Sequence, residues 1–261
     1  MEATKKYELS NITIEFNGVT LHRIKALKDF SNVKAGDLGG WVEKEDNLSQ
    51  IDDAWIDENA KVYGNAQICG NVIVFDDAII YDNAEVYGNA HICGKAQVFG
   101  NAQICGNVIV FDDAIIYDNA KVYGNAHICN NAMVYDNAFV YGDVWVYGNA
   151  KVFGNAKVDG NAKVHGNAVV CDNAMVDGNA QVYDNAEICG NAQVYGYAKV
   201  FGNARVHGNT QVYGSAKVFG NAEVCNHAKV YVNAQVYGNA VVCDNARVYG
   251  SSVVCGYAEV Y

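Results

Sequence analysis

The chain of 261 residues contains no proline, and its 18 basic residues are outnumbered by 29 acidic ones. Without proline, the corners of the fold have to be made by other residues, and the 26 glycines with the many asparagines suit that role. The net charge of −11 disfavours binding to nucleic-acid phosphates or to anionic lipid. We therefore expect no direct nucleic-acid binding.

Long apolar segments are also missing from the sequence. No apolar run approaches the roughly 18 residues of a membrane-spanning helix, and the N-terminal segment from Met1 to Glu8 lacks the apolar core of a secretory leader. We expect no membrane association and a cytoplasmic location. The nine cysteines should then be reduced thiols.

The sequence does contain one six-residue phrase, typically Val-Tyr-Gly-Asn-Ala-Lys, which recurs without insertion from Ala54 to Tyr261. From Ile56 to Val260 every sixth residue is Val or Ile, and the residue two places before it is usually Ala. The alternation in Ala-x-Val-Tyr predicts a strand with Ala and Val buried and with Tyr, Phe or Cys outside. The following Gly-Asn or Asp-Asn predicts a tight corner.

One hexad cannot bury its own Val, so successive hexads have to coil and stack. The segment from Gly64 to Cys93 recurs from Gly100 to Cys129 with one change, Glu85 to Lys121. The offset of 36 residues between the copies fits two coils of about 18 residues, because a duplication of whole coils keeps every face in register. We predict one uninterrupted solenoid of 18-residue coils over residues 54–261.

The phrase resembles the hexapeptide repeat of left-handed parallel β-helices, in which an aliphatic residue is followed four positions later by a small one. The resemblance implies a left-handed coil of triangular section. The predicted fold is therefore all-β, with a left-handed parallel β-helix over residues 51–261 and an N-terminal capping segment over residues 1–50.

The capping segment begins with an alternating run that ends at Phe16, turns at Asn17-Gly18 and resumes at Val19. An Asn-Gly dipeptide between two such runs predicts a β-hairpin, here over residues 6–27. A cap of this kind would cover the apolar end and the unpaired backbone groups of the first coil.

Four short motifs then resemble the N-terminal segment of the YdcK-like proteins, a bacterial and phage-borne family of hexapeptide β-helices. They are Asp29-Phe30, Val33-Lys34-Ala35-Gly36, Gly39-Gly40-Trp41-Val42 and Leu48-Ser49-Gln50. Members of the family are often labelled transferases, a label that comes with the fold and carries no residue motif to transfer to this chain.

An acyltransferase of this fold would need a histidine base near a cleft, with loops that shape an acceptor site. The repeat here has no loop insertions, and its histidines do not converge. We therefore predict no catalytic residues and no cofactor. Acyl transfer remains an alternative by analogy of fold, and an acidic inhibitor that mimics nucleic acid is a third possibility.

Sorting the outward position by coil places several cysteines one above another. Cys171 lies one coil before Cys189, Cys225 lies one coil before Cys243, and His207 lies between the two pairs. Neighbours in the column would be close enough for disulfides. Thiolate and imidazole suit zinc, so Cys189, His207 and Cys225 are candidate ligands, but donors on a flat face do not converge tetrahedrally. We expect reduced thiols and no structural metal.

Aromatic residues fill most of the remaining outward positions. One column is a candidate partner surface or a stiffening ladder: Tyr63, Tyr81, Phe99, Tyr117, Tyr135 and Phe153. The favoured function is a non-catalytic scaffold or partner-binding surface, with a protein partner on the aromatic faces.

The repeat is still in phase at Tyr261, which predicts an uncovered last coil. Its exposed residues would be Val242, Val248, Val254, Val260 and Tyr261. An uncovered strand edge is a template for another strand. We expect a homodimer joined through the C-terminal ends, in which one patch serves both partners.

Overall fold

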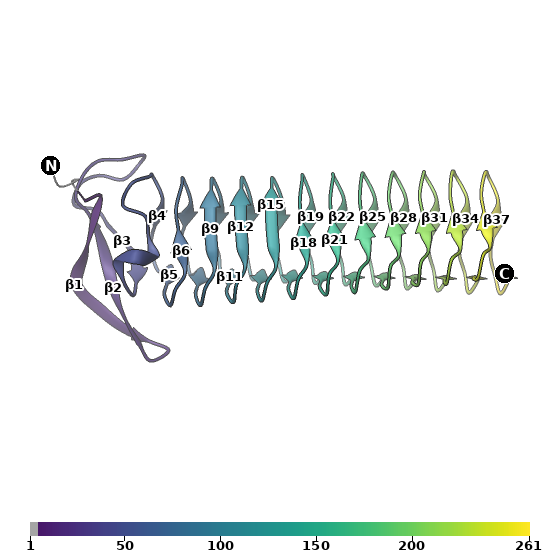
Figure 1. The fold of residues 1–261 in the computed structure, drawn as a ribbon, viewed down its shortest axis with the longest axis horizontal. Helices are drawn as coiled ribbons and strands as arrows, with labels where there is room; N and C mark the ends of the chain where they lie inside the picture. Colours follow the sequence, from purple (N-terminus) through teal and green to yellow (C-terminus); the bar gives the residue numbers. More distant parts are fainter. Residues whose placement is uncertain (1–4) are drawn as a thin grey trace. The chain divides into compact units, whose positions relative to one another are not determined.

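The computed structural model describes residues 5–261, which form two compact units that divide between Gly124 and Asn125. Both units are parallel β-solenoids in which equivalent positions of successive coils are 18 residues apart. The only helical element among the described residues is the short 3-10 helix η1 (Glu45–Asn47). The predicted all-β parallel solenoid is confirmed. Figure 1 shows the successive coils of each unit as a series of stacked strands.

The first unit contains fifteen of the strands in three sheets, ordered β1-β2-β3-β5-β8-β11-β14, β4-β7-β10-β13 and β6-β9-β12-β15. Their bounds are β1 Tyr7–Phe16, β2 Val19–Ala26, β3 Leu38–Val42, β4 Trp55–Ile56, β5 Lys61–Val62, β6 Gln67–Ile68, β7 Ile73–Val74, β8 Ile79–Ile80, β9 Glu85–Gly88, β10 His91–Ile92, β11 Gln97–Val98, β12 Gln103–Gly106, β13 Ile109–Val110, β14 Ile115–Ile116 and β15 Lys121–Gly124.

The second unit continues the same pattern in three sheets, in which every third strand along the chain is a neighbour. Its strands are β16 His127–Ile128, β17 Met133–Val134, β18 Phe139–Val140, β19 Trp145–Val146, β20 Lys151–Val152, β21 Lys157–Val158, β22 Lys163–Val164, β23 Val169–Val170, β24 Met175–Val176, β25 Gln181–Val182, β26 Glu187–Ile188, β27 Gln193–Val194, β28 Lys199–Val200, β29 Arg205–Val206, β30 Gln211–Val212, β31 Lys217–Val218, β32 Glu223–Val224, β33 Lys229–Val230, β34 Gln235–Val236, β35 Val241–Val242, β36 Arg247–Val248, β37 Val253–Val254 and β38 Glu259–Val260.

The pairing register gives the length of a coil directly. In the first unit Val98 pairs with Ile116, and in the second Val164 pairs with Val182. The two residues of each pair are 18 positions apart along the chain. Corner asparagines that are hydrogen-bonded between adjacent coils have the same separation. The paired strands are parallel, as a solenoid requires. The coil length expected from the duplicated segment is therefore confirmed within both units.

Most strands are two residues long, shorter than the four-residue Ala-x-Val-Tyr strand expected from the alternation. The Ala and Tyr positions at the two ends of this expected strand belong to the corners instead. The Ala84 amide, for example, donates a hydrogen bond back to the Tyr81 carbonyl at 3.3 Å. Between them Asp82 adopts a φ of 59°, the left-handed conformation that Asp, Asn and Gly tolerate. Six residues leave room for one turn and only two strand positions.

The core is a column of aliphatic side chains flanked by small ones. From Ile56 to Val248 every repeat Val and Ile is buried, and so are the alanines of the same coils. The expectation that all cysteines lie outside is wrong for four of them, which neighbouring coils and side chains cover at their outward positions. These four are Cys129, Cys171, Cys225 and Cys243.

The corners are joined by a ladder of asparagine side chains. In the second unit the Asn149 amide donates to Asn167 at 2.9 Å, and Asn167 donates to Asn185 at 2.8 Å. The same run extends from Asn131 to Asn239. Amide ladders of this kind stabilise stacked parallel strands, which explains the Asn in the six-residue phrase.

The N-terminal segment forms the predicted hairpin. Strands β1 and β2 are antiparallel, and Phe16 pairs with Val19 across Asn17-Gly18. Strand β3 pairs with β2 on one side and in parallel with β5 on the other. The division at residues 50 and 51 stays a prediction, since β3 already belongs to the same sheet as β5.

Candidate functional site

The aromatic column expected to form a partner surface is a set of stacked rings. In the first unit the Phe16 ring contacts Tyr63, and the rings of Tyr63, Tyr81, Phe99 and Tyr117 lie with successive centroids 5.2, 4.8 and 5.1 Å apart. In the second unit Tyr135 and Phe153 stack at 4.9 Å. All six outward residues are half-buried, so much of each ring's surface is used in stacking.

Two further stacks occur in other columns of the second unit. One runs from Tyr147 to Tyr237 through His165, Tyr183, Phe201 and Phe219, with centroid separations of 4.6 to 5.0 Å. Burial lowers the pKa of His165, which favours a neutral ring within the stack. The second stack contains Tyr195, Tyr213, Tyr231 and Tyr249, with separations of 4.9, 5.0 and 5.5 Å.

The four-tyrosine stack differs from the others in its corner. Beside Tyr195, the asparagine position of the corner holds Tyr197, which is 65% exposed. Beside Tyr231, the Gly or Asp position holds Val232, which is 46% exposed. We call these six residues the tyrosine face: Tyr195, Tyr197, Tyr213, Tyr231, Val232 and Tyr249.

Val232 has an unusual backbone for its residue type, with a φ of 66°. Every other non-glycine corner at this position of the second unit is Asp or Asn, for example Asp184 and Asn226. A β-branched residue in the left-handed region is an outlier, and such strain costs on the order of 1–3 kcal/mol. Val232 thus places an exposed apolar side chain at a position where its backbone conformation disfavours folding.

The cysteine column contains two disulfides, Cys171–Cys189 and Cys225–Cys243, with Cα atoms 4.8 and 4.6 Å apart. The expectation of reduced thiols is wrong for these four residues. The coil length brings each pair to the spacing of adjacent strands, which lies within the range of disulfide geometry. Disulfides are rare in the cytosol, so a cytoplasmic location stays a prediction.

His207 lies in the same column between the two disulfides, and its Nε2 lies 2.9 Å from Glu223 Oε1. Ligand atoms of His207, Glu223 and Cys225 all lie within 4.8 Å of one another. The other candidate ligand named from the sequence, Cys189, is not in this group; Cys171, Asp172 and Cys189 form a separate one. Glu223 was not predicted as a ligand from the sequence, because it lies two residues before Cys225 and is therefore not in the cysteine column.

The expected self-association residues differ in exposure. Val242 and Val248 are buried, whereas Val254 and Val260 are half-exposed and Tyr261 is exposed. In this chain β36, β37 and β38 are the last strands of their sheets.

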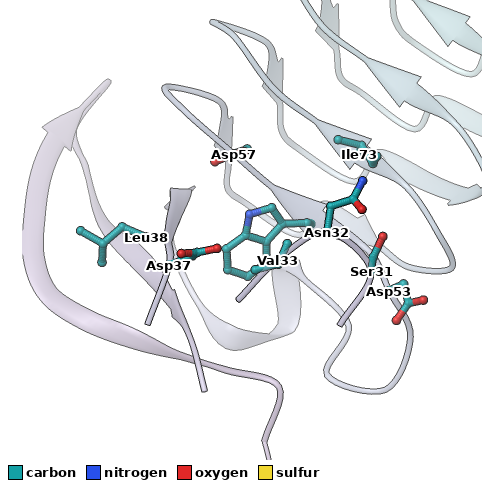
Figure 2. A pocket seen from close by; sticks show the side chains of 9 residues that line it. Ser31, Asn32, Val33, Asp37, Leu38, Asp53, Asp57 and Ile73 are labelled. Carbon is teal, nitrogen blue, oxygen red and sulfur yellow. The ribbon is translucent and has the colours of Figure 1, made fainter. Parts of the chain in front are cut away.

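One pocket of about 420 Å³ lies in the first unit, between the segment before β3 and the segment around β4. Figure 2 shows its labelled lining residues around the hollow, which include Asp37, Asp53 and Asp57. Three carboxylates give it an acidic wall, and the Trp55 ring, in edge contact with Phe30, adds an apolar one.

Near this pocket Lys6 is buried, and its Nζ donates to the carbonyl oxygens of Asp52 and Ala54, each at 2.8 Å. The Nζ also lies 5.1 Å from the centroid of the Phe30 ring. Burial lowers the pKa of Lys6 to about 8, although the nearby Asp52 carboxylate raises it. Lys6 ties the start of the chain to the loop before β4.

Comparison with known proteins agrees with this repeat architecture. The YdcK beta solenoid repeat matches residues 66–80, 102–118 and 242–256. A protein of Escherichia coli (strain K12) named "Uncharacterized acetyltransferase YdcK" is 40% identical over 76 residues, which are 26% of this chain and 23% of that protein. This chain is a YdcK-like β-solenoid. The matched part spans less than a quarter of the relative's length.

In the YdcK-like chain the tyrosine face was not among the sites predicted from the sequence, although the sequence contains a signal for it. The same sorting by coil that exposed the cysteine column also aligns Tyr195, Tyr213, Tyr231 and Tyr249. The stronger signal is the pair of apolar corner residues, Tyr197 and Val232. Val232 lies at a position that holds Gly, Asp or Asn in every other repeat from Gly64 on, and Tyr197 lies at a position that usually holds Asn. No helix of residues 5–261 is long and apolar enough to cross a membrane.

The stability of the YdcK-like chain should depend on the titration of Lys6. Its pKa is about 8 in the folded state and about 10.5 when unfolded, so between these values the unfolded chain binds more protons. Stability should therefore rise between pH 8 and pH 10.5, by up to about 3 kcal/mol. We expect urea unfolding of the wild-type chain to show this gain relative to Lys6→Met. Equal pH profiles of the two proteins would contradict it.

Proposed function

We propose that this β-solenoid is a non-catalytic scaffold that presents the tyrosine face to a protein partner. The observation that carries the proposal is Val232, a strained and exposed apolar residue beside a stack of tyrosines. Strained backbone persists where it serves a function, because the fold alone would favour Gly, Asp or Asn there. A cytoplasmic location is part of the proposal.

The chemistry of the face indicates the kind of partner. Stacked tyrosines are held in place by their neighbours, so little side-chain entropy would be lost on binding. Tyr is enriched at the centres of protein interfaces, where it contacts apolar groups and arginine. With a net charge of −11 on the chain, the partner surface should combine an apolar patch with basic residues.

Returning the corner to the repeat consensus should separate stability from binding. Val232→Gly removes the strain of a φ of 66° but adds backbone entropy to the unfolded chain, so we expect a net gain of about 1 kcal/mol in unfolding free energy. The reverse change one coil later, Gly250→Val at a φ of 68° with nothing within 4 Å of the new Cβ, should lose about 1–2 kcal/mol. Urea unfolding of both variants measures this. A destabilised Val232→Gly protein would remove the argument from strain.

The partner test uses the same face. In a pull-down from a lysate of its source cells, the wild-type chain should retain a partner protein. A triple variant with Tyr197→Asn, Val232→Gly and Tyr249→Asn should no longer retain it. Tyr141→Asn is the matched control, because Tyr141 is 48% exposed in the same column but is separated from the face by Asp159 and Asp177. Equal retention by the triple variant would refute the assignment.

The name of the relative makes acetyl transfer the second candidate function. The pocket beside β3 and β4 does not favour this function, since its lining includes Asp37, Asp53 and Asp57, whose charge would repel the phosphates of acetyl-CoA. Saturable binding of acetyl-CoA in calorimetry would favour the transferase.

The acidic-mimic hypothesis is less favoured, because corner carboxylates have a structural use. The Gly100 amide donates to Asp82 at 3.2 Å, and the Gly202 amide donates to Asp184 at 3.1 Å. These aspartates join one coil to the next and do not form a continuous charged track.

We also propose that two copies of the 261-residue chain pair through β36, β37 and β38. The half-exposed Val254 and Val260, which lie on two of these strands, support it. Val254→Lys with Val260→Lys should halve the mass measured by light scattering, whereas Val253→Lys, which alters an exposed position of the same strand, should not. A monomeric wild-type chain would refute it.

A further inference from the structure

We propose that the Cys225–Cys243 disulfide conceals a zinc site, which forms when the disulfide is reduced and uses His207, Glu223, Cys225 and Cys243 as ligands. Three of these residues already place their ligand atoms within 4.8 Å of one another. The fourth, Cys243, is bonded to Cys225. The site is independent of the tyrosine face.

The spacing of the coils fits the two thiolates. Their Cα atoms are 4.6 Å apart, and two thiolates on one tetrahedral zinc, each about 2.3 Å from the metal, lie about 3.8 Å apart. Side chains on adjacent strands can reach this separation without backbone movement.

The other two donors lie off the line of the cysteines. His207 occupies the coil before Cys225, and Glu223 lies two residues before Cys225 in the chain, with its carboxylate oxygen 2.9 Å from His207 Nε2. Donors in one straight column would not surround a metal tetrahedrally. The Glu223 carboxylate removes this difficulty, because it comes from a row of side chains beside the cysteine column. Two thiolates, one imidazole and one carboxylate are ligands that zinc accepts.

Burial of the four groups suggests how a metal would enter. Cys225 and Cys243 are buried, whereas the side chains of His207 and Glu223 are 42% and 41% exposed. The imidazole and the carboxylate are thus more accessible to solvent than the sulfurs. Zinc would meet these two donors first and the thiolates second.

Oxidation state controls the site, because a disulfide sulfur is not a thiolate ligand. A dithiol reductant supplies two electrons and two protons, which break the S–S bond, give two thiols and leave the reductant as a disulfide. Zinc then binds both sulfurs as thiolates, and the two thiol protons pass to solvent.

The test compares oxidised and reduced full-length chain. The protein is reduced with dithiothreitol, freed of reductant without air, and titrated with zinc chloride; metal content is measured after desalting. We expect one zinc per chain in the reduced protein and none in the oxidised protein. Cobalt chloride should give the thiolate-to-metal absorption and the intense visible bands of a tetrahedral site, which tests the wild-type chain without any substitution.

Variants locate the site. Cys225→Ser with Cys243→Ser should abolish zinc binding, and His207→Ala should weaken it at least tenfold. The matched control is Cys171→Ser with Cys189→Ser, which removes the other disulfide of the same column and should retain one zinc. Reduced wild-type protein that binds no zinc, equal binding by the oxidised form, or zinc lost only from the control variant would overturn the proposal.

Discussion

Val164→Asp should unfold the coils around β22, with a loss of more than about 5 kcal/mol in unfolding free energy. Val164 is completely buried and pairs with Val146 and Val182 in the adjacent coils. The carboxylate would enter an apolar column in which each neighbour along the stack is also aliphatic, so it would be buried without a partner. Loss of β-sheet circular dichroism and a lower urea midpoint measure the effect.

The matched control is Lys163→Asp, which places the same carboxylate at the preceding, exposed position of the same strand. We expect a change within about 0.5 kcal/mol there, since surface substitutions usually have small effects. Similar midpoints for the two variants would mean that the Val column does not hold the coils together.

Gly40→Val should detach β3 from the first coil and destabilise the first unit by about 3 kcal/mol or more. A Cβ at Gly40 would lie 2.6 Å from Ile56 Cγ2 and 2.7 Å from the Ala60 carbonyl oxygen. The carbonyl belongs to a backbone that is hydrogen-bonded to the Trp41 amide at 2.9 Å, so it cannot give way cheaply.

Leu38→Val is the control for this prediction, because Leu38 lies on the same strand and is exposed. Limited proteolysis within residues 5–50 should be fast for Gly40→Val and unchanged for Leu38→Val. Equal protection of both variants would show that close packing of β3 is not needed.

The repeat was predictable because its two determinants are local. A strand position that must be aliphatic and a corner that must adopt a positive φ recur in every hexad, so Val164 and Asp184 can be assigned from sequence alone. The hairpin at Asn17-Gly18 was predictable for the same reason. Strand length was not, because the Ala84 hydrogen bond to Tyr81 that shortens the strand depends on corner geometry.

The candidate sites depend on contacts between coils, which a single hexad does not contain. The cysteine pairs could be aligned by coil, but whether Cys225 and Cys243 form a disulfide depends on redox state as well as distance. Glu223 joins His207 only because the coils stack in register. The strain at Val232 becomes visible only when its φ is known.

The constant coil length has a consequence for insertions and deletions within the second unit. Removal of 18 residues, the separation of bonded asparagines in adjacent coils, takes out one whole coil and leaves every later side chain on its original sheet. Removal of a single hexad, one strand and its corner, keeps the phrase intact but rotates all that follows by one third of a turn. If such a deletion fell between Tyr213 and Tyr231, the first two tyrosines of the face would remain on one sheet while the last two moved to another. The length of the solenoid can therefore vary by whole coils without changing which residues share a face. Variation by single hexads would change which residues share a face.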